Sequence, residues 1–107
     1  FVYRDAAVID DRTVEVTVEN VAGRTGREVV QAYVRPPGGG GVDRPRRAFA
    51  GAAPVALAAG ESATVRVLLD ELAFSRYDGG WTVDTGEYDV EIGRSVADVR
   101  ATVCVDR

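Results

Sequence analysis

The sequence Thr13-Val14-Glu15-Val16-Thr17-Val18-Glu19-Asn20 places valine at every second position. In an extended chain successive side chains point to opposite faces, so the three valines share one face and the Thr and Glu side chains share the other. A strand with one apolar and one polar face is typical of an antiparallel sheet that covers a core on one side only. This segment therefore predicts an all-β chain.

The same alternation returns at residues 63–69, 86–93 and 99–105, and a weaker strand candidate spans residues 2–9. Turn-forming Gly, Asn and Asp residues separate these segments. Residues 70–75 contain at most one helical turn, with Asp70 as its N-cap. Several short strands separated by turns predict a sandwich or a barrel. We expect an antiparallel β-sandwich of about seven strands.

The segment Glu28-Val29-Val30-Gln31-Ala32-Tyr33-Val34 is apolar on both faces. Three of its apolar residues share one face, and Val29 and Tyr33 lie on the other. A strand with this pattern is covered on both sides, or it meets a partner surface. Val29 and Tyr33 are therefore candidate inter-domain contacts.

The composition excludes most catalytic and metal-binding chemistry. The 107 residues include no His, no Lys and no Met, and a single Cys. Without His there is neither a Ser-His-Asp nor a Cys-His relay, and one Cys forms neither an internal disulfide nor a Cys-rich zinc site. We expect no metal and no cofactor, and the missing Met indicates a piece of a longer or processed chain.

Charge and hydropathy argue against nucleic-acid and membrane partners. The chain has 13 basic and 17 acidic residues, which gives a net charge of −4. No apolar stretch approaches the roughly 20 residues of a membrane-spanning helix. The length and the 46% of hydrophobic residues suit one globular domain over residues 1–107. The compartment stays open between the cytoplasm and secretion from a bacterium, because any targeting signal would lie upstream.

The segment from Pro36 to Arg47 departs from the strand pattern. Two prolines precede four consecutive glycines, and Arg44-Pro45-Arg46-Arg47 follows. A glycine run has high conformational entropy, so we expect a mobile loop at about residues 36–47. Planar guanidinium groups make paired hydrogen bonds with carboxylates. Arg44, Arg46 and Arg47 could therefore bind a phosphate or an acidic surface, and the alternative is a solvated basic loop.

The aromatic residues allow two interpretations, a sugar-stacking platform or ordinary core packing. Trp81 opens a strand, and we expect it in the core. Tyr88 follows a turn at the start of a strand, a placement similar to the tyrosine corner of sandwich folds, whose hydroxyl bonds to nearby backbone. Tyr33 is the aromatic residue that we expect to meet a neighbouring domain.

The acidic residues and the lone Cys do not form a reactive site in this sequence. Almost all Asp and Glu residues fall in turns or on the polar face of a strand, so we expect no catalytic carboxylate pair. Asp78 and Asp84 lack the clustered oxygen ligands that calcium requires, and turn chemistry explains them. Cys104, near the end of the last strand, is expected to act as a small buried or edge hydrophobe.

Six segments carry distinctive residue patterns in a fixed order along nearly the whole chain: Phe1-Val2-Tyr3, Val14–Val34, Arg44–Gly51, Leu57–Ser62, Leu72–Asp78 and Trp81–Ser95. In this order and spacing they resemble the fibronectin type III-like domain at the C-terminus of family 3 glycoside hydrolases, the β-glucosidase and β-xylosidase group. The resemblance implies a fibronectin type III-like sandwich. It also implies that the two catalytic carboxylates lie in preceding barrel and α/β-sandwich domains.

The function expected from the resemblance is that of a non-catalytic accessory domain. Its partners would be the catalytic domains of the same polypeptide, which it would pack against and stabilise, and it would meet carbohydrate only indirectly. The resemblance also places Arg44, Arg46 and Arg47 just after the family's mobile loop, near those domains, which makes them candidate inter-domain contacts. Two alternatives remain at this point. One is a carbohydrate-binding module, which requires exposed, coplanar aromatic rings. The other is an immunoglobulin-like spacer or adhesion domain from an extracellular array.

Overall fold

A computed structural model describes residues 1–35, 47–77, 79–83, 85–95 and 97–107. The described chain is built almost wholly from strands, with a single 3-10 helix. In chain order the elements are β1 (Val2–Asp10), β2 (Thr13–Glu19), β3 (Gly26–Arg35), β4 (Ala48–Leu57), β5 (Ser62–Leu68), η1 (Glu71–Phe74), β6 (Ser75–Tyr77), β7 (Trp81–Val83), β8 (Glu87–Ser95) and β9 (Asp98–Asp106).

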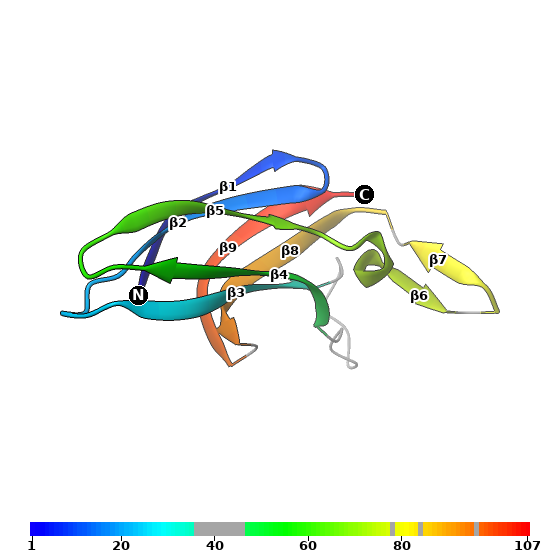
Figure 1. The fold of residues 1–107 in the computed structure, drawn as a ribbon. Helices are drawn as coiled ribbons and strands as arrows, with labels where there is room; N and C mark the ends of the chain where they lie inside the picture. The colour runs from blue at the N-terminus through cyan, green and yellow to red at the C-terminus, as the bar shows by residue number, and fades with distance from the viewer. Residues whose placement is uncertain (36–46, 78, 84, 96) are drawn as a thin grey trace.

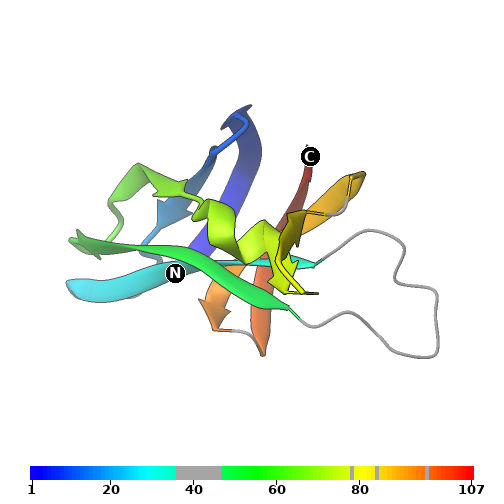
Figure 2. The ribbon, with the colours of Figure 1, turned by 90° about the vertical axis from the view of Figure 1, so that its right-hand side faces the viewer.

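Seven of the strands form two antiparallel sheets, in the orders β1-β2-β5 and β4-β3-β8-β9 (Figure 1). Their inner faces pack on one another, which confirms the predicted all-β sandwich. The short strands β6 and β7 pair only with each other. This hairpin projects beyond the end of the sandwich in Figure 1 and points toward the viewer in Figure 2.

Valines from both sheets make most of the core, as the alternation predicts. The inner residues of β2 and β3 are fully buried: Val14, Val16, Val18, Val30, Ala32 and Val34. Tyr88, Val90 and Ile92 of β8 extend the same layer. β-branched side chains have few rotamers to lose and pack well on a pleated surface. Each fully buried valine stabilises the fold by roughly 1.5–3 kcal/mol relative to an exposed one.

Strand β4 is the main element that the sequence reading missed. Its sequence is rich in alanine and contains Gly51 and Pro54, which are poor strand formers. Both residues suit its place at the edge of the sheet. Proline is tolerated there because an edge strand leaves half of its N–H groups without a ladder partner. A Cβ atom at Gly51 would lie 2.5 Å from the carbonyl oxygen of Leu68, so only glycine lets β4 approach β5 this closely.

Asn20, at the end of β2, holds four segments together at one end of the sandwich. Its side-chain amide donates to the carbonyl oxygens of Arg24 and Leu57, at 2.9 and 3.0 Å, and its oxygen accepts from the Ala22 N–H. Its backbone N–H donates to Glu61, and its carbonyl accepts from Gly60. The residue is fully buried, and these bonds join β2 and the following loop to the β4–β5 turn.

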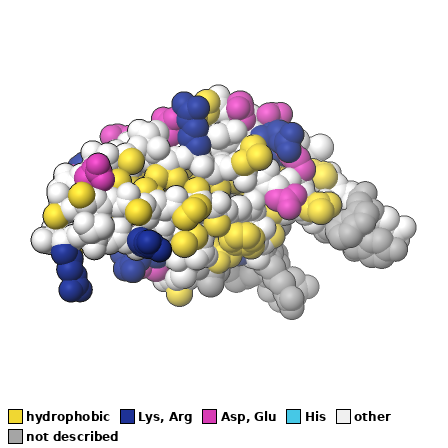
Figure 3. All heavy atoms as spheres, viewed as in Figure 1, with side chains coloured by type: hydrophobic (Ala, Val, Ile, Leu, Met, Phe, Trp, Pro, Cys, Tyr) yellow, Lys and Arg dark blue, Asp and Glu magenta, His cyan; other side chains and the backbone are white. Residues whose placement is uncertain are grey.

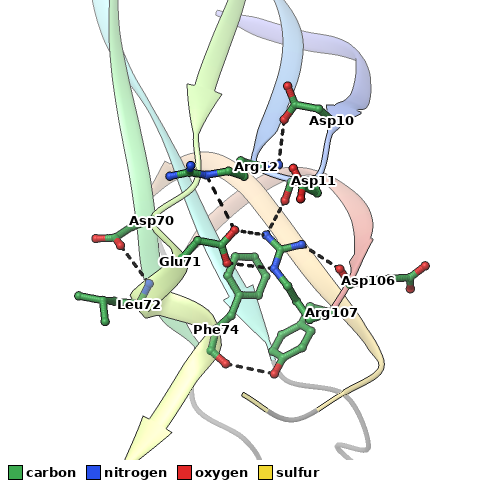
Figure 4. A network of polar contacts seen from close by, with 10 residues as sticks. Asp10, Asp11, Arg12, Asp70, Glu71, Leu72, Phe74, Asp106 and Arg107 are labelled. Carbon is green, nitrogen blue, oxygen red and sulfur yellow. Dashed lines mark hydrogen bonds and ion pairs between the residues drawn. The ribbon is translucent and has the colours of Figure 1, made fainter. Parts of the chain in front are cut away.

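Arg107 holds the opposite end, where β2 begins (Figure 4). Its guanidinium makes two hydrogen bonds to the Glu71 carboxylate, at 3.0 and 3.1 Å, and donates to the carbonyl oxygen of Asp11. The same group lies 4.0 Å from the centre of the Phe74 ring. Its backbone pairs with Gly86 in both directions. Arg107 thereby joins η1, the β1–β2 turn and the start of β8.

Replacing Asn20 with alanine is expected to lower the free energy of unfolding by about 3 kcal/mol, because it leaves buried backbone groups without partners. Urea unfolding followed by fluorescence measures this loss. The matched control is Val21→Ala at the neighbouring exposed position, with an expected change below about 0.5 kcal/mol. Equal effects of the two substitutions would show that Asn20 is only a turn residue.

Candidate functional site

The outer faces of the two sheets differ in chemistry. On the three-stranded sheet, carboxylates of β2 are paired with arginines of the neighbouring strands. Glu15 accepts from Arg66 of β5 at 3.0 Å, and Glu19 is paired with Arg4 of β1. Such exposed ion pairs are typical of a solvated surface. The same face also carries the exposed side chains of Val2 and Leu68, so it is charged along β2 and mixed at its two neighbouring strands.

On the four-stranded sheet, the outer face carries large apolar side chains. We call Val29, Tyr33, Phe49 and Pro54 the apolar face. Val29 is 46% exposed and Phe49 is 55% exposed. The Tyr33 and Phe49 rings meet edge to face, with centroids 5.5 Å apart and an interplanar angle of 71°. Figure 3 shows apolar side chains gathered over β4, the edge strand of this sheet. The face is thus an exposed patch of the kind that marks interfaces.

The two candidate contacts on β3 both belong to this face. Val29 is exposed opposite Pro54, and Tyr33 is half-buried. The Tyr33 hydroxyl donates to the side-chain oxygen of Gln31 at 2.6 Å, so the ring is held in place. Phe49 was missed by the sequence reading because its strand was missed. Its pairing with Tyr33 across β3 and β4 brings the two rings together.

Of the three candidate arginines, Arg44 and Arg46 lie outside the described residues, as does most of the segment expected to be a loop, residues 36–46. Arg47 is described, and its guanidinium is paired with the carboxylate of Glu91 on β8. Arg35 Nη1 lies 3.5 Å from the other oxygen of Glu91. Glu91 therefore contacts residues on both sides of the undescribed segment. A glutamate on the polar face of a strand gives no sequence signal for this role.

A groove of about 660 Å³ lies beside the apolar face. Its lining comprises Arg27, Glu28, Val29, Pro54, Val55, Ala56 and Arg94. The Glu28 side chain is only 4% exposed, and its Oε1 forms an ion pair with Arg94 Nε at 3.0 Å. Glu28 was not singled out from the sequence. Its position on the same face of β3 as Val30 was a usable signal, because that face is buried.

The Tyr3 hydroxyl lies beside the Glu28 carboxylate. Burial, a contact with the Glu28 side chain and its negative charge raise the pKa of Tyr3, so the phenol stays protonated at any physiological pH. Among the described residues, neither the Tyr3 hydroxyl nor Glu28 Oε2 has a hydrogen-bond partner of normal geometry. The phenol and the carboxylate therefore face each other in the interior, and the phenol is the donor available to Glu28.

Tyr88 and Cys104 have structural surroundings. The Tyr88 hydroxyl donates to the carbonyl oxygen of Phe74 at 3.1 Å, which confirms a backbone bond but places its partner 14 residues upstream rather than nearby. Cys104 is exposed on the edge strand β9. Desolvation and the neighbouring carboxylates of Asp89 and Glu87 raise the pKa of its thiol, which disfavours the nucleophilic thiolate.

The described part of the chain contains no group of three or more His, Cys, Asp or Glu residues placed to hold a metal ion. Asp78 and Asp84, considered above as calcium ligands, lie outside the described residues. Within the described ranges, no helix is long and apolar enough to cross a membrane. β7 begins at Trp81, as expected for a residue that opens a strand.

The model of the fibronectin type III-like domain matches residues 28–96. The chain belongs to this domain family. An exo-α-(1→6)-L-arabinopyranosidase of Bifidobacterium breve is 42% identical over 87% of the chain, and thermostable β-glucosidase B of Acetivibrio thermocellus is 39% identical over 80%. The chain spans only 12% of the length of each of these relatives.

Solved structures give the same result for this fibronectin type III-like domain. A β-glucosidase from Streptomyces venezuelae superposes with a TM-score of 0.80 at 31% identity, over 99% of this chain and 14% of that one. The family 3 β-glucosidase of Bifidobacterium adolescentis superposes with a TM-score of 0.78 at 37% identity, over 95% and 16%. The resemblance to family 3 glycoside hydrolases and the fold are confirmed.

The pairing of Arg47 with Glu91 is expected to contribute more than an exposed ion pair. A double-mutant cycle with Arg47→Gln and Glu91→Gln should give a coupling energy of about 1 kcal/mol, because the Glu91 side chain is largely buried. The control cycle, Arg66→Gln with Glu15→Gln, should give about 0.3 kcal/mol on the solvated face. Additive effects in the first cycle would contradict the contact.

Proposed function

We propose that residues 1–107 form a single accessory domain of a family 3 glycoside hydrolase of the β-glucosidase group. The domain has no catalytic residues of its own, and it packs against the catalytic domains of the same polypeptide and stabilises them. Val29 and Tyr33 contact those domains, and Arg44, Arg46 and Arg47 add polar contacts near them. The polypeptide that contains this chain hydrolyses glycosidic bonds through residues in its other domains.

The observation that carries this proposal is the asymmetry of the two outer faces. An exposed apolar surface on a protein is unfavourable unless something covers it. The outer face of the four-stranded sheet carries the paired Tyr33 and Phe49 rings beside Val29 and Pro54, whereas exposed apolar side chains on the other sheet, such as Leu68, lie beside ion pairs and lack such a ring pair. The relatives extend far beyond the matched region, so most of each of those chains is available to cover this face.

The ring geometry supports docking over the alternative of a sugar-stacking platform. A platform presents coplanar, exposed rings to the faces of sugar units. Tyr33 and Phe49 instead meet at 71°, and the Tyr33 hydroxyl is already bonded to Gln31. Matches to glycosidases likewise support an enzyme accessory domain over a spacer from an adhesion array.

Phe49→Asp is expected to lower the midpoint of thermal unfolding of the polypeptide that contains this chain. The charge would be buried at the contact, with an expected cost of roughly 2 kcal/mol or more. Differential scanning calorimetry measures the shift. Leu68→Asp is the matched control, because Leu68 is 64% exposed on a strand of the other sheet. Equal shifts for both variants would contradict docking through the apolar face.

Residues 1–107 alone are expected to show no turnover of aryl glycosides, because a glycosidase needs two positioned carboxyl groups. A sensitive release assay with purified chain measures this. A rate that survives purification and disappears with an acid-to-amide substitution would refute the non-catalytic assignment.

A further inference from the structure

The groove beside the apolar face is bordered by a buried carboxylate. The Glu28 side chain is only 4% exposed, and its Oε1 forms an ion pair with Arg94 Nε at 3.0 Å. The Tyr3 hydroxyl faces the same carboxylate from the interior. Glu28 therefore holds Arg94 at the edge of the groove, and its own partners come from this chain.

Two guanidinium groups flank this carboxylate. Arg94 contacts Glu28 through Nε, and its terminal Nη atoms make no hydrogen bond within the described part of the chain. The exposed guanidinium of Arg27 likewise has no ion-pair partner there. With one carboxylate and two guanidinium groups, the groove has an excess of one positive charge. Free guanidinium forks bind carboxylates in paired hydrogen bonds.

The groove is also continuous with the apolar face. Val29 and Pro54 belong to both. Hydrogen bonds also connect the apolar face with the groove. The Tyr33 hydroxyl donates to Gln31, and the Gln31 amide donates to the carbonyl oxygen of Arg94 at 2.9 Å. A body that covers the apolar face would therefore also reach the groove.

We infer that the groove seats an acidic segment of the catalytic part of the same polypeptide. A carboxylate of that segment pairs with Arg27 and Arg94, and its aliphatic atoms contact Val29 and Pro54. This inference rests on the proposed function. It adds that the part of the partner that lies in the groove is acidic. An acidic peptide segment supplies the carboxylate and belongs to a body large enough to cover the apolar face as well.

The lining of the groove favours a polypeptide segment over a free sugar. None of the residues that line it is aromatic, so the groove lacks a ring on which a sugar face could stack. Val29, Pro54, Val55 and Ala56 instead offer aliphatic contacts along β3 and β4. The relatives, of which this chain spans only 12%, have ample additional chain to supply the segment.

The absence of lysine from residues 1–107 makes a sharp test possible. In the polypeptide that contains this chain, Arg27→Lys keeps the charge and introduces a single reactive amine at the groove. A water-soluble carbodiimide then joins that amine to any carboxylate in direct contact, and mass spectrometry of the digested protein identifies the linked residues. The control is Arg66→Lys, on the solvated face beside Glu15.

The expected result is an amide link from the introduced lysine at position 27 to an Asp or Glu outside residues 1–107. The control should link only to Glu15 or to other residues of this chain. Links from position 27 that stay within residues 1–107, for example to Glu28, would overturn the inference. If Phe49→Asp still lowers the unfolding midpoint in that case, docking of the apolar face stands and only the acidic occupant is wrong. If there is no link to a residue outside 1–107 and Phe49→Asp leaves the unfolding midpoint unchanged, both proposals are wrong.

Discussion

Strand β3 has two apolar faces, and the sandwich buries only one of them. Val30, Ala32 and Val34 pack against β2 in the core, while Val29 and Tyr33 remain on the outside. Because side chains alternate strictly along a strand, no change of register could bury both sets within two sheets. The constraint links the fold to the function, since the second face can be removed from water only by another body.

The polar contacts at the two ends of the sandwich fix how its two sheets lie on one another. Asn20 ties the end of β2 to the β4–β5 turn, and Arg107 ties η1 to the β1–β2 turn and to Gly86 (Figure 4). Valine packing is nondirectional and would tolerate small slips of one sheet over the other. Hydrogen bonds with defined geometry remove this freedom. A rigid face loses less conformational entropy when it docks than a mobile one.

Period-two patterns predicted the core strands because their inner faces are built from β-branched residues. β4 could not be predicted in this way, because its alanines, Gly51 and Pro54 give no strand pattern. Gly51 suits the close approach to β5, and Pro54 suits an edge position. Both features become visible only when the neighbouring strands are in place. Glu28 and Glu91 show the same difference between what the sequence pattern predicts and what only the fold shows. Alternation places Glu28 on the buried face of β3, so its burial could have been predicted. The contacts of Glu91 join β8 to residues near the ends of β3 and β4, and only the tertiary fold brings them together.

The apolar face and the groove would make different contributions to one contact. Burial of Val29 and Phe49 is nondirectional, so it supplies affinity but fixes the orientation of the partner poorly. Paired hydrogen bonds to guanidinium groups require a carboxylate in one place and plane, so Arg27 and Arg94 would fix that orientation. Glu28 is important to this division, because it holds Arg94 through Nε and leaves the terminal Nη atoms for the partner. An accessory domain that must keep separate catalytic domains in a defined arrangement requires both kinds of contact on the same rigid sheet.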